Sequence, residues 1–330
     1  MIRTPRVLPY AQQCCKICAK NHARRALFTR NSMLLNELQA VELPGESPVA
    51  AVERILGKPF CKGEKFSIYN MDCLVAMRQL PADLFDLTIT SPPYNIGKEY
   101  EKKLSTPEYL DWCSQWIGEI YRITKSSGAF WLNLGYISLE GRAKAIPLPY
   151  LLWDKIPFYL LQELVWNYGA GVAAKKTLSP RNEKFLWYVK DPESYTFNLD
   201  EIRDPDVKYP NQKKNGKLRC NTAGKNPSDV WQVAKVTSGA NRSSSERAPH
   251  PAQFPADLID RLVKGFSNQS NLLLDPFMGS GTTAECAIRA GRYVIGFELD
   301  EDYCAHIEDR LNRVEADLQY SLIQPPQSLL

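Results

Sequence analysis

The chain has 330 residues and a formal net charge of +4, and 44% of its residues are hydrophobic. This length can bury a core large enough for one α/β domain with additions. The net charge is mild, so binding to nucleic acid would have to rely on local basic patches. No stretch is long and apolar enough to cross a membrane, and the first residues lack the apolar core of a signal peptide. The nine cysteines are scattered and form no disulfide framework, so we expect a cytoplasmic protein with reduced thiols.

Residues 1–60 have the character of a basic N-terminal extension to the main domain. Seven Lys or Arg residues precede the first acidic residue, Glu37, and apolar periodicity is weak. Positive charge without a core-forming pattern favours an arm that contacts DNA phosphates. The run from Pro44 to Pro48 predicts a linker.

Three potential metal ligands, Cys15, Cys18 and His22, lie in this extension at the spacing of half a zinc site. The next cysteine is Cys61 and the next histidine is His250, so the other half of such a site is missing. Structural zinc usually takes four ligands. We therefore predict no metal site.

The α/β pattern begins with a strand at 66–69 and helical spacing at 73–80, with Asp72 at the junction. An acidic residue in this position often caps the helix, but it can also contact a ligand. The sequence leaves both interpretations of Asp72 open.

A second strand is expected at 85–90 because apolar and polar residues alternate there, and it leads directly into Ser91-Pro92-Pro93-Tyr94. The prolines fix the backbone and donate no N–H, so their carbonyls are rigid acceptors. A hydroxyl, these carbonyls and an aromatic ring would project together from a strand end, where α/β sheets bind ligands. This arrangement suits a planar group that carries an NH₂. By itself, however, the turn is more typical of a Pro-rich strand exit, so the functional interpretation depends on the rest of the chain.

Further strands and helices alternate along the chain, which predicts a doubly wound sheet. The expected helices are 108–124, 150–161, 256–266, 284–290 and 301–318, and the expected strands are 129–135, 163–167, 185–189, 272–274 and 293–297. The aromatic residues of the 108–124 helix follow its apolar face and are predicted to lie in the core.

Apolar periodicity fades between residues 191 and 249, where basic residues lie among Asn, Ser, Gly and Pro. A solvated insertion is one interpretation. A DNA-recognition insertion fits better, since Arg, Lys, Asn and Gln read base edges in the major groove. The residues expected to contact DNA are Lys213, Lys214, Lys217 and Arg219.

The last βαβ unit carries Asp-Pro-Phe-Met-Gly-Ser-Gly-Thr-Thr at 275–283, between a strand and a helix. Gly279 and Gly281 permit close approach of a ligand to the backbone, and the helix N-terminus beyond offers N–H groups to an anion. Glu298 follows about 20 residues later, the spacing at which an acid accepts ribose hydroxyls. These features imply a ligand that contains adenosine.

A dinucleotide fits part of this pattern, because Gly279-x-Gly281-x-x-Ala284 with a later acid matches the NAD fingerprint. An NAD-linked dehydrogenase would, however, leave the Ser-Pro-Pro-Tyr turn without a purpose. It would also need a group for hydride transfer that the sequence does not reveal.

The combination of motifs resembles the β group of amino DNA methyltransferases from restriction–modification systems. The resemblance rests on Thr-Ser-Pro-Pro-Tyr, then His-Pro-Ala-x-Phe-Pro at 250–255, then the 275–283 motif, and it spans residues 66–318. It implies an α/β doubly wound mixed sheet of the Rossmann-like methyltransferase fold. It also implies a catalytic and cofactor-binding domain at 61–190 and 250–318, an inserted target-recognition region at 191–249 and a C-terminal tail at 319–330.

The same resemblance implies S-adenosyl-L-methionine as cofactor, double-stranded DNA as substrate and functional pairing with a restriction endonuclease. The implied cofactor-binding residues are Asp72, Phe254, Pro255, Asp275, Pro276, Phe277, Gly279, Ser280, Gly281, Thr282, Thr283 and Glu298. The implied catalytic residues are Ser91, Pro92, Pro93 and Tyr94.

The identity of Ser91 bears on the methylated atom. In this family the first residue of the tetrad is usually Asp or Asn in adenine-N6 enzymes and Ser in cytosine-N4 enzymes, so the resemblance implies methylation of cytosine at N4. The base must leave the duplex to reach such a site, and Tyr94 would stack on it. Methylation at carbon 5 would instead use a Pro-Cys nucleophile, and the chain contains no such pair. Adenine-N6 methylation and a DNA-binding protein without catalysis are the alternatives.

Overall fold

The computed structural model describes residues 45–97, 103–169, 171, 173–237 and 244–323. Residues 46–330 form one compact unit, and the structural statements below concern that unit. The predictions for Cys15, Cys18 and His22 lie outside the described residues. Within the described part of the chain there is no cluster of metal-ligating side chains and no helix able to span a membrane.

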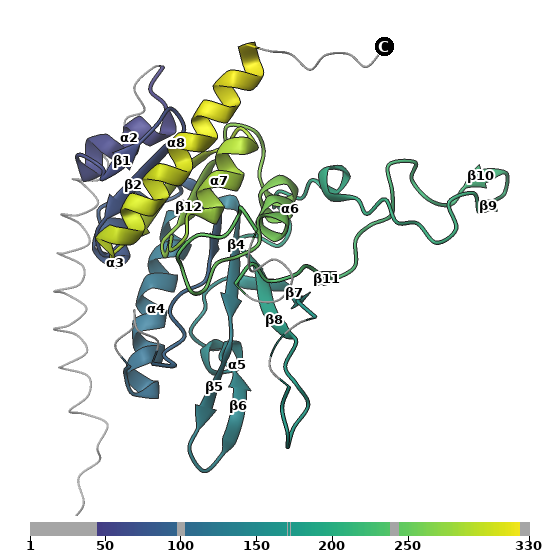
Figure 1. The fold of residues 1–330 in the computed structure, drawn as a ribbon, viewed down its shortest axis with the longest axis horizontal. Coiled ribbons are helices and arrows are strands. Elements are labelled where there is room, and N and C mark those ends of the chain that lie inside the picture. Colours follow the sequence, from purple (N-terminus) through teal and green to yellow (C-terminus); the bar gives the residue numbers. More distant parts are fainter. Residues whose placement is uncertain (1–44, 98–102, 170, 172, 238–243, 324–330) are drawn as a thin grey trace, which may run out of the picture. The chain divides into compact units, whose positions relative to one another are not determined.

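A nine-stranded sheet runs through the described residues, in the order β1-β2-β13-β12-β3-β4-β8-β7-β11 (Figure 1). In that order the strands are Cys61–Lys62, Phe66–Asn70, Tyr293–Glu298, Leu272–Asp275, Phe85–Thr90, Thr124–Leu134, Asn182–Val189, Tyr159–Asn167 and Val230–Gln232. β2, β13, β12, β3 and β4 are parallel, so their carboxyl ends meet at one edge. β8 is antiparallel to both β4 and β7, so it begins at this edge where β7 ends.

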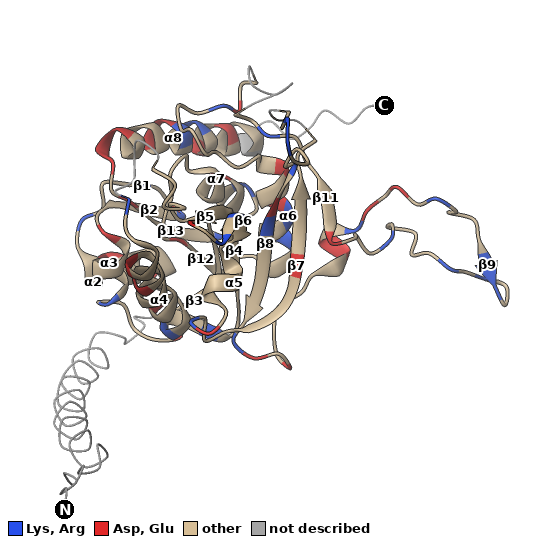
Figure 2. Cartoon of the chain, turned by 90° about the horizontal axis from the view of Figure 1, so that it is seen from below, with Lys and Arg blue, Asp and Glu red and all other residues tan. Residues whose placement is uncertain are grey.

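Helices cover both faces of the sheet (Figure 2). Helices α6 (Ala256–Phe266), α7 (Thr282–Arg289) and α8 (Glu301–Ile323) contribute to one hydrophobic core. Helices α2 (Pro48–Leu56), α3 (Cys73–Met77) and α4 (Thr106–Ile123) contribute to the core on the opposite face. The predicted doubly wound mixed sheet is therefore confirmed.

Local sequence accounts for the placement of α4. Ser105 and Glu108 form a reciprocal capping box, and Pro107 lies in the first turn, where a missing N–H costs no hydrogen bond. Trp116 is fully buried and its ring lies edge-on to that of Phe130. The aromatic face of this helix is core, as predicted.

Three local predictions were wrong. Residues 150–161 do not form one helix: α5 covers Pro149–Leu152, and β7 already begins at Tyr159, where it pairs with β8. Periodicity cannot separate a short apolar strand from a buried helix, and the pairing partner decides here. The linker predicted at 44–48 overlaps the start of a helix, because Ser47 is the N-cap of α2 and Pro48 is its first residue. This helix is part of the core, since Val52 is fully buried. Helix α8 extends to Ile323, beyond the predicted end at 318.

Several elements were not predicted. They are α2, β1, the β5–β6 hairpin (Tyr136–Leu139 and Ala143–Pro147), the 3-10 helix Leu199–Ile202, the β9–β10 hairpin (Lys213–Lys214 and Lys217–Leu218) and β11. The β9–β10 turn is Asn215-Gly216, and both residues have positive φ. This is the pattern of a two-residue hairpin turn, so it was a readable signal. The segment lies away from the sheet in Figure 1, whereas β11 returns the chain to β7.

Candidate functional site

One cavity, of about 720 Å³, lies at the edge where the parallel strands end. The structure gathers there the whole Ser-Pro-Pro-Tyr turn and most of the predicted cofactor-binding residues. From the latter set, the cavity lining includes Asp72, Phe254, Asp275, Pro276, Phe277, Gly279, Ser280, Thr282, Thr283 and Glu298. Pro255 and Gly281 instead hold the N-cap positions of α6 and α7.

In the tetrad Ser91-Pro92-Pro93-Tyr94, the two side-chain hydroxyls converge on the buried side-chain amide of Asn133. Ser91 Oγ lies 3.0 Å from Tyr94 Oη, and both hydroxyls donate to Asn133 Oδ1, at 3.2 and 2.5 Å. Asn133 lies on β4 and is fully buried, and its Nδ2 donates to the Lys184 carbonyl at 2.9 Å. The Asn133 oxygen can take the hydroxyl hydrogen of Ser91, which leaves lone pairs on Ser91 Oγ for a donor in the cavity.

The backbone of the tetrad is also held from outside. The Tyr109 hydroxyl of α4 donates to the Pro93 carbonyl at 2.6 Å. The Tyr94 ring packs so closely on Gly135 that a Cβ there would lie 2.6 Å from ring carbon Cε2. Gly135 is therefore required for close approach of this ring to the end of β4.

A second polar wall of the cavity comes from more distant segments. Glu183, on β8, lies 3.4 Å from the Tyr94 hydroxyl through Oε2 and 2.6 Å from the Lys235 ammonium through Oε1. Lys235 follows β11 and lies 3.8 Å from the centroid of the Tyr168 ring. Sequence reasoning missed this wall and Asn133, although an amide inside the apolar run of β4 was a signal for the latter.

The other half of the cavity is the β12–α7 turn. Gly279 has φ +54°, and a Cβ there would meet the His250 imidazole at 2.9 Å, so only glycine fits without displacement. His250 packs edge-on against the Tyr303 ring, and burial lowers its pKa to about 4, so the imidazole is neutral at physiological pH.

Glu298 ends β13 and closes this turn. Its Oε2 accepts from the Gly279 N–H at 2.8 Å, and its Oε1 accepts from the Leu299 and Asp300 N–H groups at 2.9 and 3.0 Å. Burial raises the pKa of this carboxyl, and the three N–H groups oppose the shift. A carboxylate has about four lone-pair sites, so acceptor capacity remains for a ligand hydroxyl.

Asp275 joins the two halves of the cavity. Its Oδ1 accepts from the Thr90 hydroxyl at 2.8 Å, and Thr90 is the residue before the Ser-Pro-Pro-Tyr turn. Asp275 is almost completely buried, and burial raises its pKa to about 7. This contact holds the end of β3 against the end of β12.

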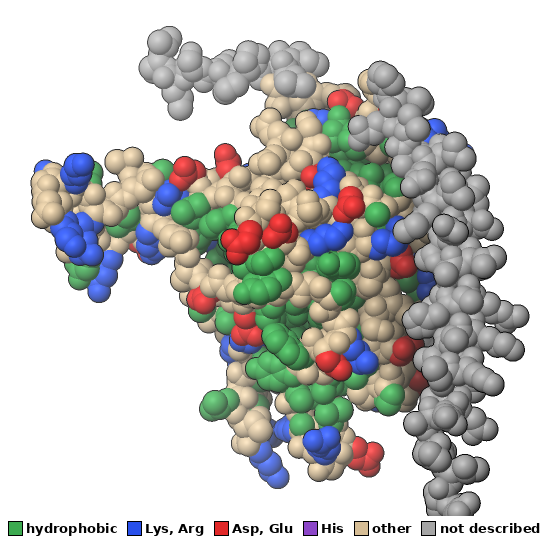
Figure 3. All heavy atoms as spheres, turned by 180° about the vertical axis from the view of Figure 1, so that it is seen from behind, with side chains coloured by type: hydrophobic (Ala, Val, Ile, Leu, Met, Phe, Trp, Pro, Cys, Tyr) green, Lys and Arg blue, Asp and Glu red, His purple; other side chains and the backbone are tan. Residues whose placement is uncertain are grey.

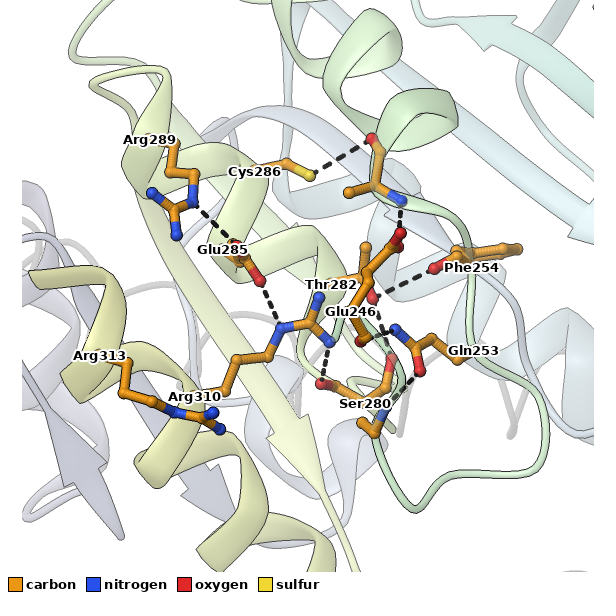
Figure 4. A network of polar contacts seen from close by, with 12 residues as sticks. Glu246, Gln253, Phe254, Ser280, Thr282, Glu285, Cys286, Arg289, Arg310 and Arg313 are labelled. Atoms are coloured by element: carbon orange, nitrogen blue, oxygen red, sulfur yellow. Dashed lines mark hydrogen bonds and ion pairs between the residues drawn. The ribbon is translucent and has the colours of Figure 1, made fainter. Parts of the chain in front are cut away.

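A polar network holds the Phe254-Pro255 segment on α7 (Figure 4). Gln253 Oε1 accepts a hydrogen bond from the Ala248 N–H, and Gln253 Nε2 donates one to the Glu246 carbonyl. The Glu246 carboxylate accepts from the Ala256 N–H at 2.6 Å. Glu246 thus supplies the cap that Pro255 cannot give to α6. Thr282 Oγ1 donates to the Phe254 carbonyl at 3.4 Å, which links this segment to the first turn of α7.

The N-cap interpretation of Asp72 is confirmed, and contact with a ligand stays a prediction. Its side chain accepts from the Val75 N–H at 3.0 Å as the N-cap of α3, and it also lines the cavity. The cavity therefore joins two acids, Asp72 and Glu298, a glycine turn without Cβ bulk and the uncapped start of α7. Together these features fit a nucleoside that carries a small zwitterionic group.

Residues 85–309 match the DNA methylase family, which covers N6 and N4 enzymes. The chain belongs to this family. It is 55% identical to the type II methyltransferase M.ScaI of Streptomyces caespitosus over 294 residues, which cover 89% of this chain and 94% of that protein. The DNA adenine methyltransferase YhdJ of Escherichia coli (strain K12) is 31% identical over 78% of this chain and 85% of its own.

The methylase also resembles solved structures. The PvuII DNA methyltransferase, described as cytosine-N4-specific, superposes with a TM-score of 0.61 at 21% identity, over 78% of this chain and 94% of that chain. The likeness confirms the Rossmann-like fold of S-adenosylmethionine-dependent methyltransferases that the sequence predicted.

Proposed function

We propose that this methylase transfers a methyl group from S-adenosyl-L-methionine to the exocyclic N4 of a cytosine flipped out of duplex DNA. The proposal rests on Ser91, which stands first in the tetrad where the adenine enzymes of the family usually carry Asp or Asn. The type II relatives support a role in the cytoplasm, where methylation protects host DNA from a cognate restriction endonuclease.

The residues of the cavity can prepare the amine for attack. Its lone pair is delocalised into the ring, so it is a poor nucleophile. Ser91 Oγ, whose hydrogen can be held by Asn133, and the Pro92 carbonyl would accept the two N–H groups and favour a pyramidal nitrogen. The Tyr94 ring would stack on the base. Holding the reacting groups in near-attack geometry supplies much of the remaining acceleration.

The cofactor half has a separate task. When bound, S-adenosylmethionine supplies a methyl group on a cationic sulfur, so the reaction requires no metal. Glu298 and the Gly279 turn would hold the ribose, and Asp72 would lie near the adenine. The Phe254-Pro255 segment would border the methionine end. The contact between Thr90 and Asp275 keeps this half in fixed relation to the catalytic turn.

Adenine-N6 methylation is the second candidate, because YhdJ, a relative named as a DNA adenine methyltransferase, shares 31% identity with the chain. Both amines can be held by the same acceptors, so the base is selected by the rest of the pocket.

Mass spectrometry of nucleosides decides between these products. Plasmid DNA is incubated with the purified protein and labelled cofactor, then digested to nucleosides. We expect label in N4-methylcytosine. Label only in N6-methyladenine would overturn the cytosine assignment, and absence of label from both would reject methyl transfer. The Ser91→Ala variant is the matched control for contaminating activity.

A further inference from the structure

The insertion reaches the catalytic cavity through Lys235. Strand β11 pairs in parallel with β7, with Trp231 opposite Trp166. Just beyond β11, the Val233 carbonyl accepts from Trp166 Nε1 at 2.8 Å, and the side chain of Val236 is fully buried. Lys235 lies between these two anchors, so its backbone is fixed by the sheet and the core.

The Lys235 side chain is held in the cavity wall. Its ammonium lies 2.6 Å from Glu183 Oε1 and over the rings of Tyr168 and Trp166, at 3.8 and 5.5 Å from their centroids. About a quarter of the side chain remains exposed. An ammonium has three N–H donors, and Glu183 is its hydrogen-bond partner among the described residues. N–H groups that do not bond Glu183 can therefore turn towards a ligand in the cavity.

The same ion pair reaches the catalytic turn. The second oxygen of Glu183 lies 3.4 Å from the hydroxyl of Tyr94, which contacts Ser91. Lys235, Glu183 and Tyr94 therefore form a continuous polar chain from the predicted target-recognition region to the catalytic tetrad.

Resting on the proposed cytosine-N4 activity, we propose that Lys235 is a specificity-determining residue that donates hydrogen bonds to N3 and O2 of the flipped-out cytosine. Enzymes that act on a flipped base read its Watson–Crick edge by hydrogen bonds. On cytosine this edge presents the amine, followed by two acceptors, N3 and O2. The tetrad supplies acceptors for the amine, so the remaining edge requires donors.

Two other N–H donors of the cavity wall are already engaged. Asn133 Nδ2 donates to the Lys184 carbonyl, and Trp166 Nε1 donates to the Val233 carbonyl. Lys235 would also discriminate cytosine from other bases, because their edges carry different hydrogen-bonding groups. Thymine presents an N–H at N3, and adenine presents a C–H where cytosine has O2, so neither matches two donors.

Glu183 is a positioning residue in this arrangement. An uncompensated cation beside the base would draw the lone pair of the amine further into the ring and weaken it as a nucleophile. The ion pair with Glu183 balances this charge while the N–H donors remain available. The carboxylate also fixes the ammonium against the Tyr168 ring.

The test compares two duplexes that carry the recognition sequence, once this has been mapped on methylated plasmid DNA. The duplexes differ only at the target position, which holds either cytosine or an abasic site, and S-adenosylhomocysteine occupies the cofactor site. The Lys235→Met variant keeps the apolar stem but loses the donors. We expect its affinity for the cytosine duplex to fall about tenfold to hundredfold, as for a hydrogen bond from a charged donor, with affinity for the abasic duplex unchanged. An equal loss for both duplexes, or no loss for either, would overturn the proposal.

Lys208→Met is the matched control, because Lys208 also lies over a tyrosine ring, that of Tyr209, but does not line the catalytic cavity. Its effect should be the same on both duplexes. Thermal unfolding checks that Lys235→Met folds. If Lys235→Met does not fold, Lys235→Gln replaces it, because glutamine retains neutral N–H donors. Its affinity for the cytosine duplex should also fall relative to the abasic duplex, but by a smaller factor. The proposed function is tested separately, by looking for labelled N4-methylcytosine after reaction with the unmodified enzyme. If this product is absent, the proposed function is rejected whatever the variants show.

Discussion

The carboxylate of Glu298 accepts a hydrogen bond from the backbone N–H of Gly279 at 2.8 Å. One acid at the end of β13 thus shapes the glycine turn of the neighbouring strand, and the same acid faces the proposed ribose site. The turn and the acid are therefore one structural unit, although they are about 20 residues apart in the sequence.

This relationship predicts the effect of Glu298→Gln on cofactor binding. The glutamine keeps the volume but loses charge and acceptor capacity, so it cannot serve three N–H groups and the ribose together. We expect S-adenosylmethionine to bind about tenfold to hundredfold more weakly in calorimetry, in line with the loss of charge-assisted hydrogen bonds. Glu301→Gln, at a neighbouring exposed acid, is the control and should bind normally. Binding of NAD in place of S-adenosylmethionine by the unmodified chain would restore the dehydrogenase interpretation.

Asn133 gives a second prediction, on catalysis. Asn133→Leu removes the shared acceptor of Ser91 and Tyr94, so the two hydroxyls would bond each other or turn towards the base. We expect methyl transfer to fall about tenfold to hundredfold, with cofactor affinity nearly unchanged. Asn133→Asp retains an acceptor and should recover part of the rate. Equal turnover in Asn133→Leu and the unmodified enzyme would show that the amide does not orient the tetrad.

The sequence predicted those parts of the site that are encoded locally. Both turns follow strands, and parallel strands bring their carboxyl ends together, so Ser91 and Gly279 had to share an edge. Asn133, Glu183 and Lys235 could not be placed in the same way. Their convergence depends on the register of β4 with β8 and of β7 with β11, which a single sequence does not specify. The wrong helix prediction at 150–161 has the same origin. Residues from Tyr159 onward form β7 because they pair with β8 and β11, and these pairings are not visible in the local sequence.

Asp275 predicts a pH dependence of stability. Burial raises its pKa to about 7, whereas an unfolded Asp titrates near 4. Between these values the folded protein retains a proton that the unfolded chain releases. Stability from this carboxyl is therefore complete below about pH 4 and is lost as the pH rises through 7.

The Asp275→Asn variant isolates this contribution. Asparagine keeps an oxygen for the Thr90 hydroxyl but has no charge to bury. We expect the variant to gain stability relative to the unmodified protein as the pH rises from 5 to 8, by the order of 1–4 kcal/mol. Urea unfolding at the two pH values measures the difference. A difference in stability that does not change with pH would contradict a carboxyl titrating in this range.

The last prediction concerns the β9–β10 hairpin, whose end carries exposed basic side chains (Figures 2 and 3). Lys214 pairs directly with Lys217, and like charges opposite each other destabilise an isolated hairpin. A polyanion would relieve this repulsion. Arg219 is held in place by a hydrogen bond from its Nη1 to Gln212 Oε1 at 3.3 Å. These features support contact of the hairpin with DNA phosphates.

Salt dependence measures such contacts, because each phosphate contact adds about 0.9 to the slope of log K against log salt. Lys214→Ser with Lys217→Ser should lower the slope by about 2, and adding Lys213→Ser and Arg219→Ser should lower it by up to about 4. The control removes two exposed charges outside both predicted DNA-contacting segments, in Lys155→Ser with Arg313→Ser, and should leave the slope unchanged. If any of these four side chains also contacts a base edge, its substitution should in addition broaden the set of plasmid sequences that the protein methylates. A slope equal to that of the unmodified protein in the fourfold variant would exclude the hairpin from the DNA interface.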